Sequence, residues 1–203
     1  RFTSLYSEIT NKFSNDYKKQ KQPVRLANFV IAENTVALSN GKDVSVRLVM
    51  TEGNYFDEEY AGAAGGIYSE NYQGSYEIQI LNSDGKLISK TNFENERQPA
   101  NFARKFNLLF HDYNKDKHPD FSIGQWESSS MNIYELYTIM PDGTVKKISS
   151  EAFVHYSHDF SVKFNKDKDS GFYAQFYNNA IGETGTNHFV WDKNKNSFKE
   201  VQS

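Results

Sequence analysis

The residues from 110 to 124 carry the clearest chemistry in the chain. Within a nine-residue stretch, oxygen-bearing side chains stand at the first, third, fifth and ninth positions: Asp112, Asn114, Asp116 and Asp120. A hard cation such as calcium takes about six to eight oxygen ligands, and a tightly wound loop can point alternate side chains and one backbone carbonyl at a common centre. The carbonyl here would be that of His118. We therefore predict that these five residues bind one Ca²⁺ ion.

The flanking sequence argues against a helix-loop-helix calcium site. An EF-hand needs a glutamate at the twelfth loop position and a helix on each side. Ile123 occupies that position, and both 106–110 and 120–124 have the pattern of strands. The alternative that remains open is a hairpin turn rich in Asp and Asn that holds no ion, because both residue types are common in turns.

The motif resembles the calcium loop of the FG-GAP and VCBS families, in which Asp-x-Asn/Asp-x-Asp-Gly-x-x-Asp precedes an apolar strand and a glycine. The matching residues are Asp112, Asn114, Asp116, Asp120 and Gly124. The resemblance implies a loop that joins two strands of a β-propeller blade in a secreted or cell-surface protein, with those four side chains and the His118 carbonyl as ligands. It covers about fifteen residues in a single copy, so a propeller of repeated blades is not supported.

One departure from this motif bears on affinity. Lys117 stands where the families have glycine, at a position that usually needs a positive φ, and a non-glycine residue there costs about 1 kcal/mol. Lys115 and Lys117 also offset the acidic charge. We expect weak binding, in the ~10⁻⁴ to 10⁻³ M range of extracellular modules. A site of that affinity would stay empty in the cytosol, which favours an extracellular or surface-anchored protein.

The segment from 51 to 74 is a second candidate site. Its Gly, Ala, Asn and Glu content predicts a long irregular connection, and such loops are usually functional or disordered. Its aromatic residues could form a binding surface for a cell-wall glycan or a protein partner, or could fold back onto the core: Tyr55, Phe56, Tyr60, Tyr68 and Tyr72. The rival hypothesis is a secreted hydrolase of polysaccharide or peptide that uses a carboxylate pair from Glu58, Glu59 and Glu70.

Two weaker patterns contain metal-binding residue types. His155 and His158 could bind zinc with His111 or His118, but on a strand the first two would point to opposite faces, which favours surface histidines. The segment 165–171 contains half of a second calcium loop, yet its ninth position is Tyr173, which favours a solvated turn. No G-x-S-x-G elbow, H-E-x-x-H zinc motif or phosphate-binding loop is present in the sequence.

Composition limits the classes of partner. The net charge is −3 and no basic stripe is interleaved with aromatic residues, so we expect no nucleic-acid partner. No apolar run approaches the ~20 residues of a membrane span. The chain starts at Arg1 and lacks cysteine, which fits a mature protein whose signal peptide or lipid anchor has been removed. It resembles extracellular or lipoprotein-type domains of Gram-positive bacteria.

The remaining patterns predict a mainly β protein. Apolar residues at helical spacing indicate an amphipathic helix over 1–20, and alternating segments from residue 24 to 201 indicate antiparallel hairpins and a final meander that includes 161–164. Two similar stretches, 76–87 and 134–145, each predict a hairpin with an Asp-Gly turn. We expect one domain over 1–203, a calcium-binding module more than an enzyme.

Overall fold

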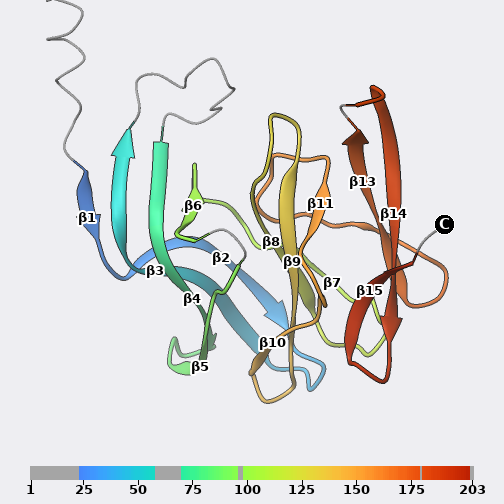
Figure 1. Cartoon of the computed structure of the whole chain (residues 1–203). Coiled ribbons are helices and arrows are strands. Elements are labelled where there is room, and N and C mark those ends of the chain that lie inside the picture. The colour runs from blue at the N-terminus through green and yellow to red at the C-terminus, as the bar shows by residue number, and fades with distance from the viewer. Residues whose placement is uncertain (1–22, 58–69, 96–97, 179, 202–203) are drawn as a thin grey trace, which may run out of the picture.

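The computed structural model describes residues 23–57, 70–95, 98–178 and 180–201, and within these ranges the protein is all β (Figure 1). Its strands form three antiparallel sheets, which we call sheets A, B and C in chain order. The predicted mainly β, antiparallel architecture is confirmed. The helix expected over residues 1–20 lies outside the described residues. In the part of the chain that the structure describes, no helix is long and apolar enough to cross a membrane.

Sheet A is built on one long hairpin. Strands β3 (Asp43–Asp57) and β4 (Glu70–Asn82) pair along their whole length, and shorter strands flank them. On the outer side of β3 lie β1 (Val24–Leu26) and β2 (Phe29–Ala37). On the outer side of β4 lie β5 (Leu87–Asn92) and β6 (Ala100–Phe102).

The prediction of an irregular connection over 51–74 is wrong at both ends of this segment. Residues 51–57 and 70–74 belong to β3 and β4, which stay paired as far as Asp57 and Glu70. Gly53 and Gly74, two of the glycines of this segment, are instead paired across the hairpin, where a Cβ on Gly53 would lie 2.4 Å from the carbonyl oxygen of Gln73. Glycine is needed at this position because the two backbones approach so closely. The middle of the segment lies outside the described residues.

Sheets B and C follow in order along the chain. Sheet B contains β7 (Phe110–His111), β8 (Asp120–Trp126), β9 (Asn132–Ile139) and β10 (Val145–Lys147), with β11 (Phe153–His155) beside the other end of β9. Sheet C is a simple meander of β12 (Asn165–Lys166), β13 (Gly171–Asn178), β14 (Glu183–Asp192) and β15 (Ser197–Val201).

The meander was predicted, but its expected first strand was not found. Residues 161–164 form no strand, because this segment connects sheet B to sheet C and its bonds are made largely with side chains, such as that from the Val162 N–H to the Ser122 hydroxyl of β8. The Ser161 hydroxyl accepts the N–H of Leu109, and the N–H of Phe164 donates to the hydroxyl of Tyr113.

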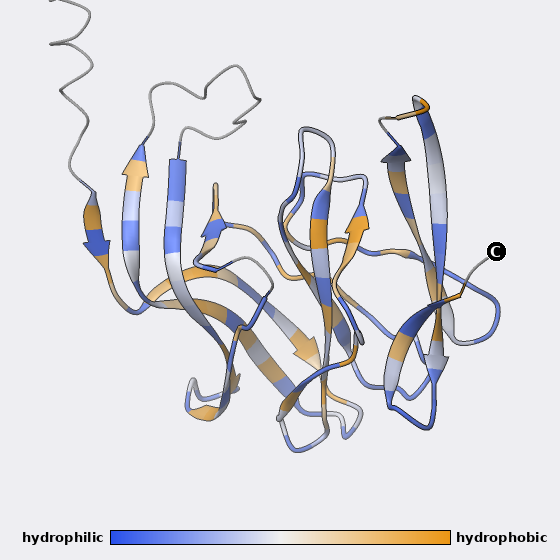
Figure 2. Ribbon diagram, in the orientation of Figure 1, coloured by the Kyte–Doolittle hydropathy of each residue, from blue (hydrophilic) through white to orange (hydrophobic). Residues whose placement is uncertain are grey.

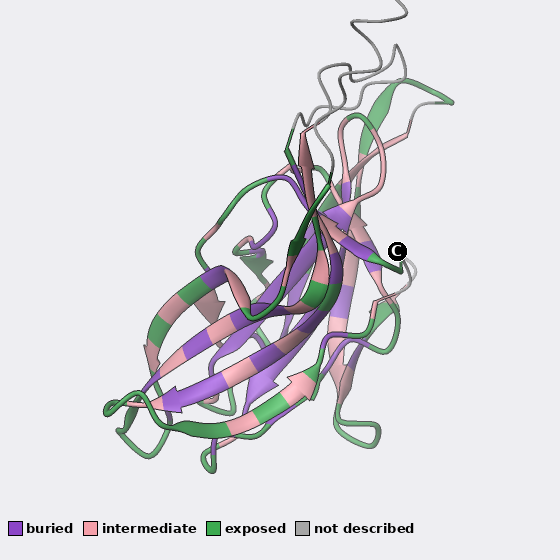
Figure 3. Cartoon of the chain, turned by 90° about the vertical axis from the view of Figure 1, so that its left-hand side faces the viewer, coloured by how far each residue is buried: buried purple, intermediate pink, exposed green. Residues whose placement is uncertain are grey.

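Two hydrophobic cores join the three sheets into a stack. The first contains buried residues of sheets A and B, such as Leu48, Ile78, Phe121 and Ile139. The second contains buried residues of sheets B and C, such as Tyr134, Phe153, Phe172 and Phe198. Sheet B is therefore covered on both faces, and β8 and β9 are almost continuously buried. Strands of sheet A instead alternate between hydrophobic and polar residues (Figure 2) and between buried and more exposed ones (Figure 3).

The outward face of sheet A is polar and paired. Glu33, Arg47, Gln79 and Lys90 stand in one row across β2, β3, β4 and β5. The Arg47 guanidinium lies 2.7 Å from Glu33, and Lys90 lies 3.5 Å from Glu77. On the outward face of sheet C, Tyr173 stacks on His188, whose Nε2 lies 2.8 Å from Asp167.

Both Asp-Gly hairpins are confirmed, as the β4–β5 and β9–β10 turns. Gly85 and Gly143 have φ values of +76° and +86°, which a residue with a Cβ adopts only at a cost. The turns also bring sheets A and B together, since the Ser89 hydroxyl of β5 donates to the carbonyl of Gly143 at 2.6 Å.

Candidate calcium site

The predicted calcium loop connects β7 to β8 in sheet B. It leaves the sheet after His111 and returns at Asp120, and these two residues are paired partners. The expectation that the loop joins two strands is therefore confirmed. The strand expected over 106–110 is shorter, since only Phe110 belongs to β7 and Phe106 makes a single bridge to Ala32.

Three of the predicted ligand side chains bond to the backbone of the loop itself. The Asp112 carboxylate accepts the N–H groups of Asp116 at 3.2 Å and Lys117 at 3.1 Å. The Asn114 side-chain oxygen accepts the N–H of Asp116 at 3.2 Å. Asp116 accepts the N–H of His118 at 2.8 Å and the Asn114 amide at 2.9 Å. These bonds wind the chain tightly and place the Asn114 amide in contact with the Asp116 carboxylate.

The backbone of the loop is strained at both lysines. Lys115 has a φ of +63° and Lys117 a φ of +67°, in the left-handed region that favours glycine. The prediction of a positive φ at the position of the missing glycine is confirmed, and Lys115 adds a second such residue. Each costs about 1 to 2 kcal/mol relative to an ordinary conformation. Such strain is retained only when the surrounding structure fixes the loop.

Asp120 has a different environment from the other three. Its side chain is fully buried, and burial raises its pKa to about 7. The N–H of Tyr113 donates to Oδ2 at 2.8 Å and lowers the pKa, as does the Thr138 hydroxyl, while the carboxylates of Asp116 and Asp112 raise it further. Oδ1 makes no hydrogen bond that meets ordinary geometry. The site therefore contains a buried carboxylate oxygen without a good partner, close to two other carboxylates.

His118 closes the loop on its exposed side. Its Nδ1 lies 3.2 Å from Asp116 Oδ2, so the ring and the carboxylate are neighbours. A shallow hollow of about 350 Å³ lies beside the loop, lined in part by Phe110, His111, Asp112 and His118. Burial lowers the pKa of His111 and the nearby Lys166 and Lys163 lower it further, which favours the neutral ring.

The described residues contain no group of three or more His, Cys, Asp or Glu side chains already placed to hold a metal ion. Asp112, Asp116 and Asp120 are residues of these types, so their carboxylates are not gathered closely enough in this structure to form such a group by themselves. The other two predicted donors are the Asn114 side chain and a backbone carbonyl. All five donors are oxygen atoms, which suits calcium better than zinc or copper. The chemistry of the donor set and the buried Asp120 oxygen fit a hard cation.

The structure brings together only part of the second candidate site. Tyr55, Phe56 and Tyr72 lie near the end of the β3–β4 hairpin, whereas Tyr60 and Tyr68 lie outside the described residues. Tyr72 stacks on Phe29 with ring centroids 5.1 Å apart, and it packs against the core between sheets A and B. Tyr55 leans on Tyr72 at 5.0 Å. These two rings therefore follow the alternative in which the aromatic residues fold back on the protein.

The described histidines do not converge on a zinc site. His155 is packed between Tyr134 and Phe164, and its Nδ1 accepts the N–H of Gln175 at 3.0 Å. The half-loop at 165–171 forms the β12–β13 turn, in which Asp167 pairs with His188 instead of an ion. His155 is therefore half-buried, not the surface histidine that the sequence suggested, whereas the segment 165–171 forms the expected hairpin turn.

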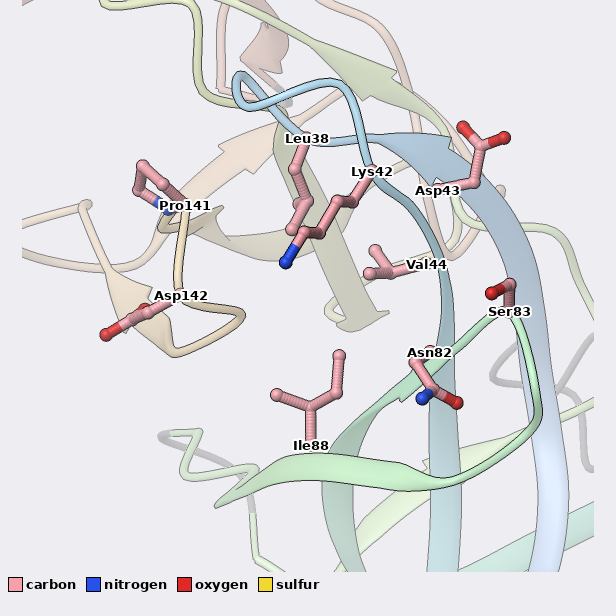
Figure 4. A pocket seen from close by; sticks show the side chains of 9 residues that line it. All are labelled: Leu38, Lys42, Asp43, Val44, Asn82, Ser83, Ile88, Pro141 and Asp142. Atoms are coloured by element: carbon pink, nitrogen blue, oxygen red, sulfur yellow. The ribbon is translucent and has the colours of Figure 1, made fainter.

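A larger cavity lies where three hairpin turns of sheets A and B meet (Figure 4). It has a volume of about 510 Å³ and a mixed lining whose apolar residues include Leu38, Val44 and Ile88. The Lys42 amine extends into it, and Asp43 and Asp142 stand at its edges (Figure 4). One ammonium and two carboxylates at the same opening define no single class of ligand.

Two features of the site were not predicted. The burial of Asp120 follows from its place as the first residue of a strand that is covered on both faces. Tyr113, inside the loop, is also buried, and the only signal in the sequence was an aromatic residue between two ligand positions.

The fold and the site define a three-layer stack of antiparallel sheets with an oxygen-rich loop in its middle layer. Comparisons with protein-family models, with curated proteins and with solved structures found no match for the chain.

Proposed function

We propose that this protein is an extracytoplasmic calcium-binding β-domain with a binding or structural role. The ion is held by the side chains of Asp112, Asn114, Asp116 and Asp120 and by the carbonyl of His118. The observation that carries the proposal is the Asp120 carboxylate, which is fully buried beside two further carboxylates and has one oxygen without a good hydrogen bond. A buried carboxylate of this kind is costly when charged, so it either takes up a proton or needs a cation to compensate its charge.

A turn without an ion explains less of the structure. Hydrogen bonds from Asp112, Asn114 and Asp116 to the loop backbone are what a turn rich in Asp and Asn makes. A turn does not need a carboxylate in the sheet behind it, and an apolar residue at position 120 would avoid the desolvation cost. A cation between Asp120 and the loop accounts for both features.

The expected affinity supports a location outside the cytoplasm. Lys115 and Lys117 reduce the negative potential of the loop, and both are held at positive φ. We therefore expect a dissociation constant in the ~10⁻⁴ to 10⁻³ M range, which suits a module that works in millimolar calcium. A secreted or surface-anchored protein, including a lipoprotein, meets that condition, and the FG-GAP and VCBS likeness of the loop points the same way.

The hydrolase alternative has no comparable support. Of its three candidate carboxylates, Glu58 and Glu59 lie outside the described residues, and Glu70 stands exposed at the start of β4, where the Tyr55 hydroxyl lies 3.4 Å away. We therefore propose that a cell-wall glycan or another protein is a partner that the module binds, not a substrate that it hydrolyses.

Calorimetric titration of calcium into chelator-treated protein tests the proposal directly. We expect a binding heat in the wild type and none in Asp116→Ala, because this substitution removes a central ligand. Asp84→Ala is the matched control, since Asp84 lies in the exposed β4–β5 turn far from the loop, and it should bind as the wild type does. Equal heats in the wild type and in Asp116→Ala would remove the assignment.

A further inference from the structure

The loop that carries the proposed ligands is also attached to sheet C. Tyr113, which follows the first ligand, is 1 % exposed and belongs to the core between sheets B and C. Its ring lies 5.2 Å from that of Phe172 in β13 and 6.5 Å from that of Phe198 in β15. Its hydroxyl accepts the N–H of Phe164 at 2.9 Å. A residue in the middle of the loop thus contributes to the packing of the third sheet.

Two polar contacts join the same loop to the β12–β13 turn. The Lys115 amine donates to the carbonyl of Lys168 at 2.5 Å, and the Ser170 hydroxyl donates to the carbonyl of Asn114 at 3.2 Å. The carbonyl of Ser170 in turn accepts the N–H of Trp191 in β14 at 2.9 Å. Contacts from three consecutive loop residues, 113 to 115, therefore reach sheet C.

The buried ligand holds these contacts in place. Asp120 Oδ2 accepts the N–H of Tyr113, so the carboxylate fixes the backbone from which the Tyr113 ring extends. Asp120 also stands opposite Thr138, in the alternating set of β9 residues that includes Tyr134 and Leu136 of the core between sheets B and C. The proposed ion and the packing of sheet C thus act on the same short segment.

We propose that the loop couples calcium binding to the docking of sheet C on sheet B, so that the calcium concentration sets how firmly the third sheet is held. This inference rests on the proposed calcium site and adds a role for the ion. When the ligands are drawn together, Tyr113 and Lys115 are fixed in the positions that contact sheet C. When they are not, repulsion among Asp112, Asp116 and Asp120 loosens the segment that carries these contacts.

Linkage gives the size of the expected effect. Ligand binding makes any opening of the structure that destroys the ligand site less frequent. The factor is one plus the ratio of the free ligand concentration to the dissociation constant, so it is about a hundredfold when the concentration is a hundred times that constant. Openings of sheet C that leave the loop intact would not change at all. The factor by which calcium slows the opening of sheet C therefore shows whether that opening also disrupts the loop.

Hydrogen exchange on the full chain, with calcium and with chelator, measures this factor. We expect exchange to slow by similar factors in the loop, residues 112–120, and in β13 and β14, and calorimetry on the same samples reports whether calcium binds. Amides of β3 and β4 in sheet A give the reference for global unfolding. Binding heat with slowing confined to the loop would overturn the coupling and leave the calcium site standing. No binding heat would instead remove the site and the coupling together.

A double variant separates the contacts from the ligands. Lys115→Met with Ser170→Ala removes both polar contacts to the β12–β13 turn and keeps every ligand side chain. We expect it to bind calcium at least as tightly as the wild type, because a positive charge is lost beside the site, while the slowing in β13 and β14 falls severalfold. Lys168→Met with Ser170 unchanged is the matched control, because only the carbonyl of Lys168 makes the contact. Undiminished slowing in the double variant would overturn the role of Lys115 and Ser170 in the coupling, and only the Tyr113 ring would then be left to carry it.

Discussion

Single residues in this protein show why the sequence predicted the ligand set but not its environment. The spacing of Asp112, Asn114, Asp116 and Asp120 is a local property that the chain displays directly. The full burial of Asp120 depends on sheets A and C covering both faces of sheet B, which is a long-range result. The role of Tyr113 was missed for the same reason, since its ring contacts residues about fifty or more positions further along the chain.

His155 provides a prediction about pH at the residue scale. Burial lowers its pKa, and a second proton on Nδ1 would break the bond from the N–H of Gln175. The folded state therefore disfavours the charged ring. Its contribution to stability is fully present above the ordinary histidine pKa of about 6.5 and is lost as the pH falls from there through the lowered value.

Urea unfolding at about pH 7.5 and pH 5 checks this prediction. The wild type should lose more unfolding free energy between the two pH values than His155→Asn, in which the amide oxygen can still accept the Gln175 N–H but does not titrate. The two proteins would show the same pH dependence if His155 were exposed and unconnected in solution.

Elements were predicted well where the turn chemistry was strong. Asp-Gly between alternating residues located the β4–β5 and β9–β10 turns, because positive φ at glycine favours a tight hairpin. The same residue type misled at 51–74, where Gly53 and Gly74 are strand residues that allow two backbones to approach. A glycine in the sequence does not reveal which of these two needs it serves.

The two hairpin glycines allow a paired prediction. Gly85→Ala should cost about 1 kcal/mol, because its added Cβ meets no atom within 4 Å and only the positive φ is penalised. Gly143→Ala should cost more, because its Cβ would also lie 2.8 Å from the Ile88 side chain across the contact between sheets A and B. Chemical denaturation of both variants measures the difference, and equal losses would mean that Ile88 gives way without cost.

At the scale of the whole molecule, the sequence predicted strands but not their division into three layers. A strand that is covered on both faces can be recognised in the sequence only when it is almost entirely apolar. The strands β8 and β9 are covered on both faces, yet their buried residues include Asp120, Ser122 and Glu135. The polar rows on the outward faces of sheets A and C follow from the alternation of polar and apolar residues in the sequence. Which sheet packs on which does not follow from that alternation.

Substitutions on the two faces of the stack should differ sharply. Phe172→Ala removes a fully buried ring from the core between sheets B and C and should cost about 3 to 5 kcal/mol of unfolding free energy. Arg47→Ala removes a partly exposed pair with Glu33 on the outward face of sheet A and should cost about 1 kcal/mol or less. Thermal or urea unfolding of the two variants compares them. A large loss in Arg47→Ala would mean that this face is covered in solution.

The three sheets also follow one another along the chain, from sheet A to sheet C, and no strand of the described ranges returns to an earlier layer. The last strand of sheet A ends at Phe102, yet its apolar face is completed by residues of sheet B and by Phe160. Until residues 103–160 have folded against it, sheet A has one uncovered apolar face. Folding intermediates in which this face is still exposed would be prone to aggregation.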